Sequence, residues 1–274
     1  MARLTRKLWV GIGSLAIAGA ALPGAAGAQA SLRGQPPPTA TREDGAANTP
    51  AEGGEAYLTD GGPSDTRIRF YRDIELMRGH LLIGQELIEG DLWDEALPHF
   101  LHPTEELYGR MERYIVLHNI PPFRRELQAL AQTVKARRMG AYLEARAVVD
   151  RQLDSALAVA KQFMHPLRGF AARSAAEVLK VALSEYATSL EDGRFVRPVE
   201  YQDSRGFVWC AERLIEKSAG ELAKADPAAF AKINAAFLKL KAAWPAPMPP
   251  AAPVLQTGEV SALVTAIELN ALRY

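Results

Sequence analysis

The feature that most constrains the fold of this chain is a helical spacing of apolar residues, which begins after Asp65 and continues almost to the C-terminus. In its first segment, Ile74, Met77, Leu81 and Gly84 follow one another at steps of three or four residues, which places them on one face of a helix. No stretch of the sequence sustains the alternation of period two that a half-buried strand requires. The sequence therefore predicts an all-α fold, a bundle of antiparallel helices.

Capping residues, glycines and prolines divide this region into separate helices. Asp65 and Asp226 have short side chains that can accept hydrogen bonds from the free N–H groups of a first turn, and Pro227 suits the first helical position. Gly90 ends the first helix, and the short turn there predicts an antiparallel hairpin with the second. The proline-rich segment 244–253 is expected to be an extended connector. We expect helices over residues 66–89, 92–101, 103–118, 123–138, 141–164, 166–190, 200–224, 227–243 and 260–272.

The N-terminal region predicts export. Residues 1–30 combine a basic start, an apolar core from Leu8 to Leu22 and two small-x-small cleavage signals, which is typical of a cleavable signal peptide. The apolar core is shorter than the roughly 20 residues of a membrane span, and no cysteine lies near the cleavage signals to carry a lipid. Residues 31–64 are rich in Gly, Pro, Ala and Thr and predict a disordered linker. The mature chain is therefore expected to be periplasmic or secreted, without a transmembrane span.

The remaining residues, 65–274, are enough for one substantial helical domain. Segments 81–108 and 181–207 share a partial pattern of a long helix, an acidic turn with glycine, an aromatic residue and a proline. This similarity leaves open a division into two related halves, 65–164 and 165–274. The second segment has no histidine, so we expect any site to belong to the first half alone.

Charge and motifs exclude several classes of protein. Without the three basic residues of the signal peptide, the chain has 29 basic and 32 acidic residues, a net charge of −3, which argues against a nucleic-acid partner. Cys210 is the only cysteine, and its apolar helical context predicts a buried thiol that packs as a small hydrophobic side chain. The sequence contains no Gly-x-Ser-x-Gly, phosphate-binding glycine loop or His-Glu-x-x-His motif, so we do not expect an enzyme.

One stretch of the chain concentrates residues that can bind metal ions. It holds three of the five histidines, His80, His99 and His102, together with Glu105 and Glu106. Imidazole and carboxylate groups are the usual ligands of borderline transition metals. His99 and His102 are three residues apart and so share a helical face, and both glutamates lie within one turn of His102. These five residues are our candidate ligands for an iron, copper or zinc ion.

The position of His80 turns this cluster into a geometric hypothesis. His80 follows Met77 by three residues and precedes Gly84 by four, so it faces the apolar side of its helix. If the next helix folds back, His99 or His102 would lie beside it. A structural explanation remains open, because a histidine at a helix cap and acids in a first turn are favoured without any ligand.

Two families resemble parts of this chain. An exported all-α chain over 65–274 with the element His102-Pro-Thr-Glu105 resembles the imelysin and EfeO-type group of periplasmic proteins, although Phe100 stands where that group usually has glycine. This resemblance implies a metal-linked periplasmic role such as iron or copper capture.

Residues 79–100 are similar to one tetratricopeptide-type hairpin, in which the small and aromatic residues serve helix packing. No 34-residue repeat follows in this chain.

Two functional hypotheses result. The first is a non-catalytic periplasmic helical bundle that binds a transition metal ion in metal uptake or homeostasis, with a periplasmic or membrane-transport protein as its partner. The alternative is an interaction or scaffold protein that binds a protein or peptide along a helical groove. The first requires the nitrogens of His80, His99 and His102 to meet near one point, whereas the second predicts histidines that are buried singly or point outward.

Overall fold

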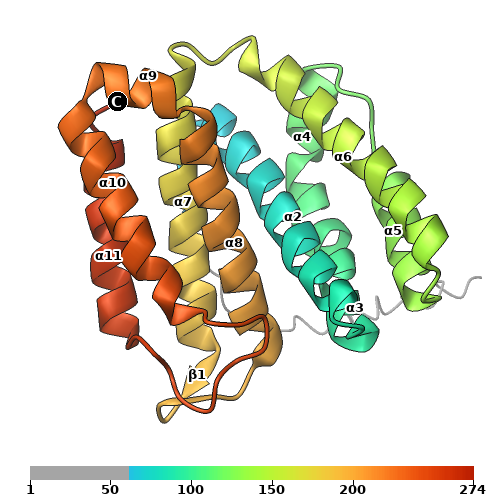
Figure 1. Cartoon of the computed structure of the whole chain (residues 1–274). Helices are drawn as coiled ribbons and strands as arrows, with labels where there is room; N and C mark the ends of the chain where they lie inside the picture. Colours follow the sequence, from blue (N-terminus) through green and yellow to red (C-terminus); the bar gives the residue numbers. More distant parts are fainter. Residues whose placement is uncertain (1–61) are drawn as a thin grey trace, which may run out of the picture. The chain divides into compact units, whose positions relative to one another are not determined.

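The structure, a computed structural model, describes residues 62–274, which form an all-α bundle as the sequence predicts (Figure 1). The predicted signal peptide, 1–30, and all but the last three residues of the predicted linker, 31–64, lie outside the described residues. No helix among the described residues combines the length and the apolar character that crossing a membrane requires.

Each predicted helix has a counterpart in the structure. Before residue 165 the elements are α2 (Thr66–Glu89), α3 (Trp93–His102), the π-helical segment η1 (Pro103–Tyr108), α4 (Gly109–Leu117), α5 (Arg124–Lys135) and α6 (Met139–Lys161). After it they are α7 (Leu167–Thr188), β1 (Leu190–Glu191), β2 (Arg194–Phe195), α8 (Pro198–Lys217), α9 (Ala219–Ala225), α10 (Pro227–Leu240), the 3₁₀ turn η2 (Lys241–Ala243) and α11 (Thr257–Ala271).

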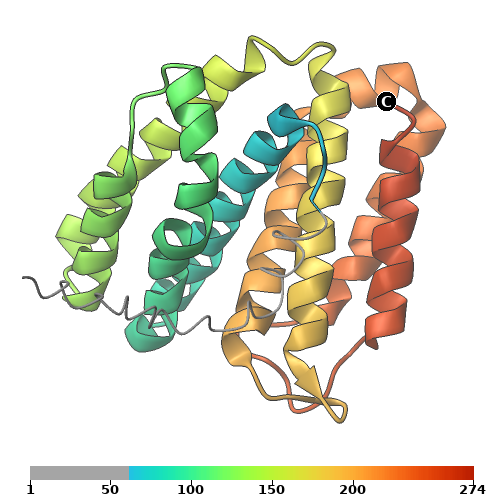
Figure 2. The same cartoon turned by 180° about the vertical axis from the view of Figure 1, so that it is seen from behind.

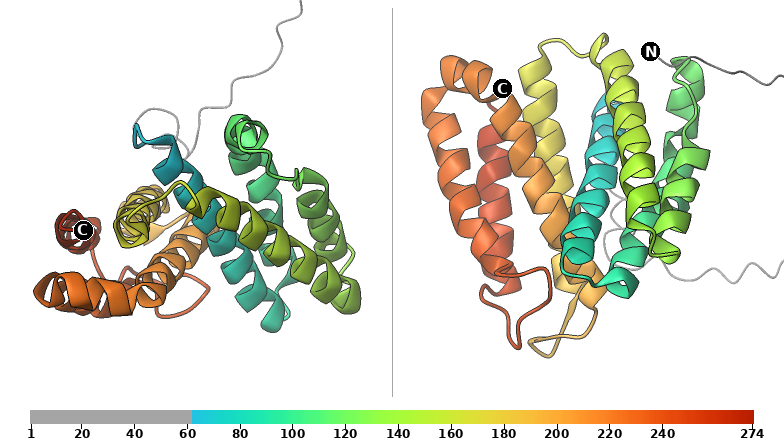
Figure 3. Two further views of the ribbon diagram at one scale, coloured as in Figure 1. Left: turned by 90° about the horizontal axis from the view of Figure 1, so that it is seen from above. Right: turned by 45° about the vertical axis from the view of Figure 1, so that its right-hand side comes forward.

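The helices α2, α7 and α8 lie at the centre of the bundle. The helix α8 makes its most extensive contacts with α7 and α2, and α2 also packs against α7. On one side α10 and α11 form a pair that packs against α7 through α11 (Figure 3). On the other side α3 and α6 pack against α2, and α5 packs against α3 and α6. The helix α3 folds back along α2 after a short turn, and η1 and α4 continue in the same direction (Figure 2).

Local sequence signals explain several of the helix ends. The Asp65 carboxylate accepts a hydrogen bond from the backbone N–H of Arg67 at 2.9 Å, and Asp226 accepts one from Ala229 at the same distance, so both predicted caps are confirmed. At the end of α2, Asp91 rather than Gly90 adopts the left-handed conformation, with φ of 61°. This turn directs α3 back along α2.

Three local features differ from the predictions. The two helices predicted over 92–101 and 103–118 form one uninterrupted helical run, in which Pro103 begins the π-helical segment η1. Proline has no N–H to continue the regular hydrogen-bond ladder, which accounts for the irregular turn at this position.

The helix predicted over 200–224 is divided into α8 and α9 at Ser218. The chain also contains a two-stranded hairpin, β1 with β2, whose turn has positive φ values at Asp192 and Gly193, as Asp-Gly turns favour.

Glycines allow α2 and α8 to approach closely. A Cβ atom at Gly206 of α8 would overlap the backbone carbonyl oxygen of Gly79 on α2. Within the α2–α3 hairpin, a Cβ at Gly84 would lie only 2.5 Å from the ring of Phe100. The small residues therefore hold three helices close together next to His80, which follows Gly79 in the chain.

Cys210 lies on the buried side of α8 and is 3% exposed. Burial raises the pKa of its thiol to about 12, so the thiolate is not populated at neutral pH. The sequence prediction of a packed thiol agrees with this environment.

We predict that Gly206→Ala destabilises the protein by about 2 kcal/mol or more. The added methyl group would overlap the backbone of α2 at Gly79 and would push α8 away from α2. Gly140→Ala is the matched control, since a Cβ there meets nothing within 4 Å and should stabilise the protein by up to about 1 kcal/mol. Chemical denaturation of the two variants measures both effects. Equal stabilities would show that the close approach is not a constraint on the fold.

Candidate metal centre

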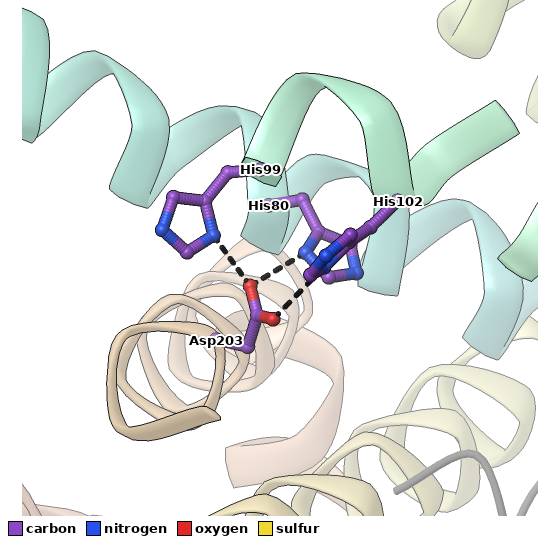
Figure 4. A group of neighbouring side chains, drawn as sticks. All are labelled: His80, His99, His102 and Asp203. Atoms are coloured by element: carbon purple, nitrogen blue, oxygen red, sulfur yellow. Dashed lines mark hydrogen bonds and ion pairs between the residues drawn. The ribbon is translucent and has the colours of Figure 1, made fainter. Parts of the chain in front are cut away.

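Three helices bring four side chains with metal-binding atoms together. His80 comes from α2, His99 and His102 come from α3, and Asp203 comes from α8, as Figure 4 shows. The α2–α3 hairpin places the three histidines on one side, and the close contact of α2 with α8 presents the carboxylate from the other. One nitrogen of each histidine and one oxygen of Asp203 all lie within 4.8 Å of one another.

The carboxylate of Asp203 is the centre of this group. Its Oδ1 atom lies 2.6 Å from Nδ1 of His80 and 2.7 Å from Nδ1 of His99. Its Oδ2 atom lies 3.1 Å from Nδ1 of His102. The side chains of His80, His99 and Asp203 are at most 6% exposed, whereas that of His102 is 21% exposed. The group is therefore buried, and it approaches the surface at His102.

A neighbouring amide orients the His99 ring. Nε2 of His99 lies 2.9 Å from Oε1 of Gln202, and the Gln202 amide nitrogen donates to Sδ of Met248 at 3.3 Å. In a metal-bound state, Nε2–H would donate to the amide oxygen and leave the Nδ1 lone pair of His99 for the ion. A second hydrogen bond of this kind commonly fixes the tautomer and orientation of a metal-binding histidine.

The electrostatics of the group are those of a buried carboxylate shared by imidazoles. Burial acts to raise the pKa of Asp203, but His80, His99 and His102 hold it well below its usual range. Burial lowers the pKa of His80, against the opposing effect of Asp203. Burial also acts to lower the pKa of His102, but Asp203, Glu106 and Glu185 outweigh it and raise the pKa to about 9. In the metal-free protein a proton on His102 therefore balances the Asp203 charge.

The two predicted glutamate ligands have different positions. Oε1 of Glu106 lies 3.5 Å from Nδ1 of His102, beside the group, while Glu105 is exposed. Neither belongs to the set of four, in which Asp203 supplies the carboxylate. The expectation that the site belongs to the first half alone is wrong in this respect, because α8 lies in the second half.

Sequence reasoning missed Asp203 because its partners lie more than 100 residues away in the chain. A signal was nevertheless present, since Asp203 shares one helical stripe of α8 with the buried residues Phe207, Cys210 and Leu214. A carboxylate within an apolar stripe has to be paired, because an unpaired buried charge is too costly. The remaining histidines, His118 and His165, are outside the group.

The proline-rich connector, residues 244–256, holds the turns of α8 just before and after the carboxylate. The hydroxyl of Tyr201 donates to the carbonyl oxygen of Ala246 at 3.0 Å, and Nη1 of Arg205 donates to that of Trp244 at 2.6 Å. These two residues lie two positions before and after Asp203. The connector therefore fixes α8 on both sides of the carboxylate.

The donor set suits a first-row transition metal ion. Three imidazoles and a carboxylate are accepted by zinc, copper and iron. Ligand atoms at about 2.0–2.2 Å from one ion lie about 3–4 Å apart. Nδ1 of His80 and of His99, at 2.6 and 2.7 Å from Oδ1 of Asp203, would therefore have to move away from that oxygen to admit an ion, whereas donor atoms up to 4.8 Å apart would have to close in. Binding would replace the proton on His102 with a metal ion, because a metal-binding imidazole has to be neutral.

Comparison with known proteins shows that part of the chain is similar to a helical domain associated with iron permeases. Residues 167–272 match the family described as the iron permease-associated 4-helix bundle domain. This match spans fewer than half of the 274 residues and covers α7 to α11, which include Asp203, while the three histidines precede it. No curated protein and no solved structure matches the chain.

The match bears on the resemblances stated from the sequence. The match agrees with the general expectation of a helical bundle with a role connected to metal ions. It does not single out the imelysin or EfeO-type group. The class that fold and site define is therefore a helical bundle with a buried cluster of three histidines and one aspartate, part of which is similar to a domain associated with iron permeases.

We predict that Glu106→Gln lowers the pKa of His102 in the metal-free protein by roughly half a unit to one unit, because it removes a nearby negative charge. Glu105→Gln is the control, since Glu105 is exposed and should leave this pKa unchanged. NMR titration of the imidazole measures both. Equal shifts in the two variants would contradict the assignment of Glu106 as the partner of His102.

The raised pKa of His102 also makes the stability of the metal-free protein depend on pH. The pKa of His102 is above its ordinary value of 6.5, so its protonated form stabilises the metal-free protein below that pH. This contribution is lost as the pH rises through about 9.

Proposed function

We propose that this protein is a periplasmic helical bundle that binds a transition metal ion through His80, His99, His102 and Asp203. It acts in metal uptake or homeostasis, with iron as the foremost candidate, and it delivers or receives the ion without catalysing a reaction. The observation that carries the proposal is the convergence of three imidazole Nδ1 atoms on one buried carboxylate.

The burial of the group supports binding over catalysis. A catalytic metal site keeps an open position for substrate, whereas here three of the four side chains are at most 6% exposed. Only the His102 side approaches solvent, which gives an ion a route in and out. Glu106 and the buried Glu185 both act on His102 and provide further negative charge for a dication at this entrance.

Two further features support a transport role. The region 167–272 is similar to a domain that is named for its association with iron permeases, so a membrane permease is the partner that we propose. The basic and apolar pattern of residues 1–30 supports export to the periplasm, where such a bundle would meet metal ions before transport. Sites with imidazole ligands generally bind Cu²⁺ more tightly than either Fe²⁺ or Zn²⁺. Affinity alone would therefore not select iron over copper.

We predict that Asp203→Asn and His99→Gln weaken metal binding by about 100-fold or more, since each removes one ligand of a four-ligand set. His165→Gln is the matched control, because His165 is exposed and lies outside the group. Titration of the metal-free protein with Fe²⁺, Zn²⁺ and Cu²⁺ by calorimetry provides the affinities, and circular dichroism shows that each variant is folded.

Wild-type protein should bind one equivalent of metal more tightly than about 1 µM. Weaker binding in the wild type, or the same affinity in wild type, Asp203→Asn and His99→Gln, would rule out the site. An equal loss in His165→Gln would show that the histidines bind metal nonspecifically.

A further inference from the structure

A hollow lies between the N-terminal part of α2 and the helix α4, away from the candidate metal centre. Its volume is about 530 Å³, a size typical of sites for small molecules. It shares no residue with the group around Asp203, and its residue Asp73 precedes His80 by seven positions, about two turns of α2. The lining residues are Thr66, Arg69, Phe70, Asp73, Arg110, Met111, Arg113, Tyr114 and Leu117.

The charged lining of this hollow is mainly basic. Arg69, Arg110 and Arg113 face it together with a single carboxylate, Asp73. That carboxylate is 3% exposed and accepts a hydrogen bond at 2.8 Å from Nε of Arg72, and the charges of Arg110 and Arg69 act on it as well. With three arginines and one carboxylate, the lining of the hollow carries more positive than negative charge.

The floor of the hollow is apolar and aromatic. Phe70 and Met111 are almost completely buried, and the Tyr114 ring stacks on Phe70 with centroids 4.2 Å apart. Among the residues that the structure describes, the buried hydroxyl group of Tyr114 has no hydrogen-bond partner. A buried polar group without a partner is costly, so the hydroxyl is available to a ligand.

A smaller hollow of about 430 Å³ adjoins the first and shares Arg113 and Leu117 with it. Its other lining residues are Glu112 and the exposed Val116. Glu112 is paired with Arg124 at 2.8 Å, so its charge is also compensated from outside the hollow.

We propose that the larger hollow binds a small organic anion with two or more carboxylate groups. Guanidinium groups pair with planar carboxylates through two parallel hydrogen bonds, which makes Arg69 and Arg113 suitable for such a ligand. The apolar floor would contact its carbon skeleton, and the Tyr114 hydroxyl would bind one further oxygen. This proposal does not rest on the metal site, since none of the four candidate ligands lines the hollow.

The test is a calorimetric titration of the whole metal-free protein with tricarballylate, a tricarboxylate, and in parallel with inorganic phosphate. We expect tricarballylate to bind more tightly than about 1 mM and more tightly than phosphate. Arg69→Gln and Arg113→Glu should each weaken tricarballylate binding by about tenfold or more, because each removes a charged donor.

The control is Arg125→Glu, which makes the same charge change as Arg113→Glu at an exposed arginine that does not line the hollow. Its affinity should stay within about twofold of the wild type, because an exposed charge at a distance is largely screened. Three results would overturn the proposal: no binding of tricarballylate, phosphate binding that is equally tight, or an equal loss in Arg125→Glu. None of them would change the outcome of the metal titration.

Discussion

The centre of this structure depends on one buried carboxylate, that of Asp203, which is surrounded by His80, His99 and His102. Moving a carboxylate out of water costs several kcal/mol, and the cost is acceptable only when a compensating charge lies close. In the metal-free protein, the proton on His102 provides that charge, since its pKa is about 9. A metal ion that displaces this proton would supply the compensating positive charge in its place, so the carboxylate would be paired in both the empty and the loaded state.

The surrounding helices hold this charge in place from two sides. On one side Gly206 and Gly79 let α8 approach α2, which carries His80. On the other side the connector 244–256 receives hydrogen bonds from residues of α8 that flank the carboxylate. The close helix contact and the connector are far apart in the sequence, and together they fix the position of Asp203 relative to the histidines.

Local sequence patterns predicted most of the fold and part of the site. Periodicity and the caps at Asp65 and Asp226 located the helices, and the inward position of His80 followed from its spacing along α2. Asp203 could not be found in this way, because the contact between α2 and α8 is a matter of tertiary packing. Glu105 was chosen for its nearness in sequence to His102, but side chains on a helix point in different directions, and it is exposed.

The most direct test of the account is a crystal structure of the protein loaded with Zn²⁺, in which anomalous scattering locates the ion. The account predicts one ion at about 2.0–2.2 Å from Nδ1 of His80, His99 and His102 and from the carboxylate of Asp203. Nε2 of His99 should still contact Gln202. An ion bound elsewhere, or four side chains that keep their metal-free contacts in the presence of zinc, would contradict it.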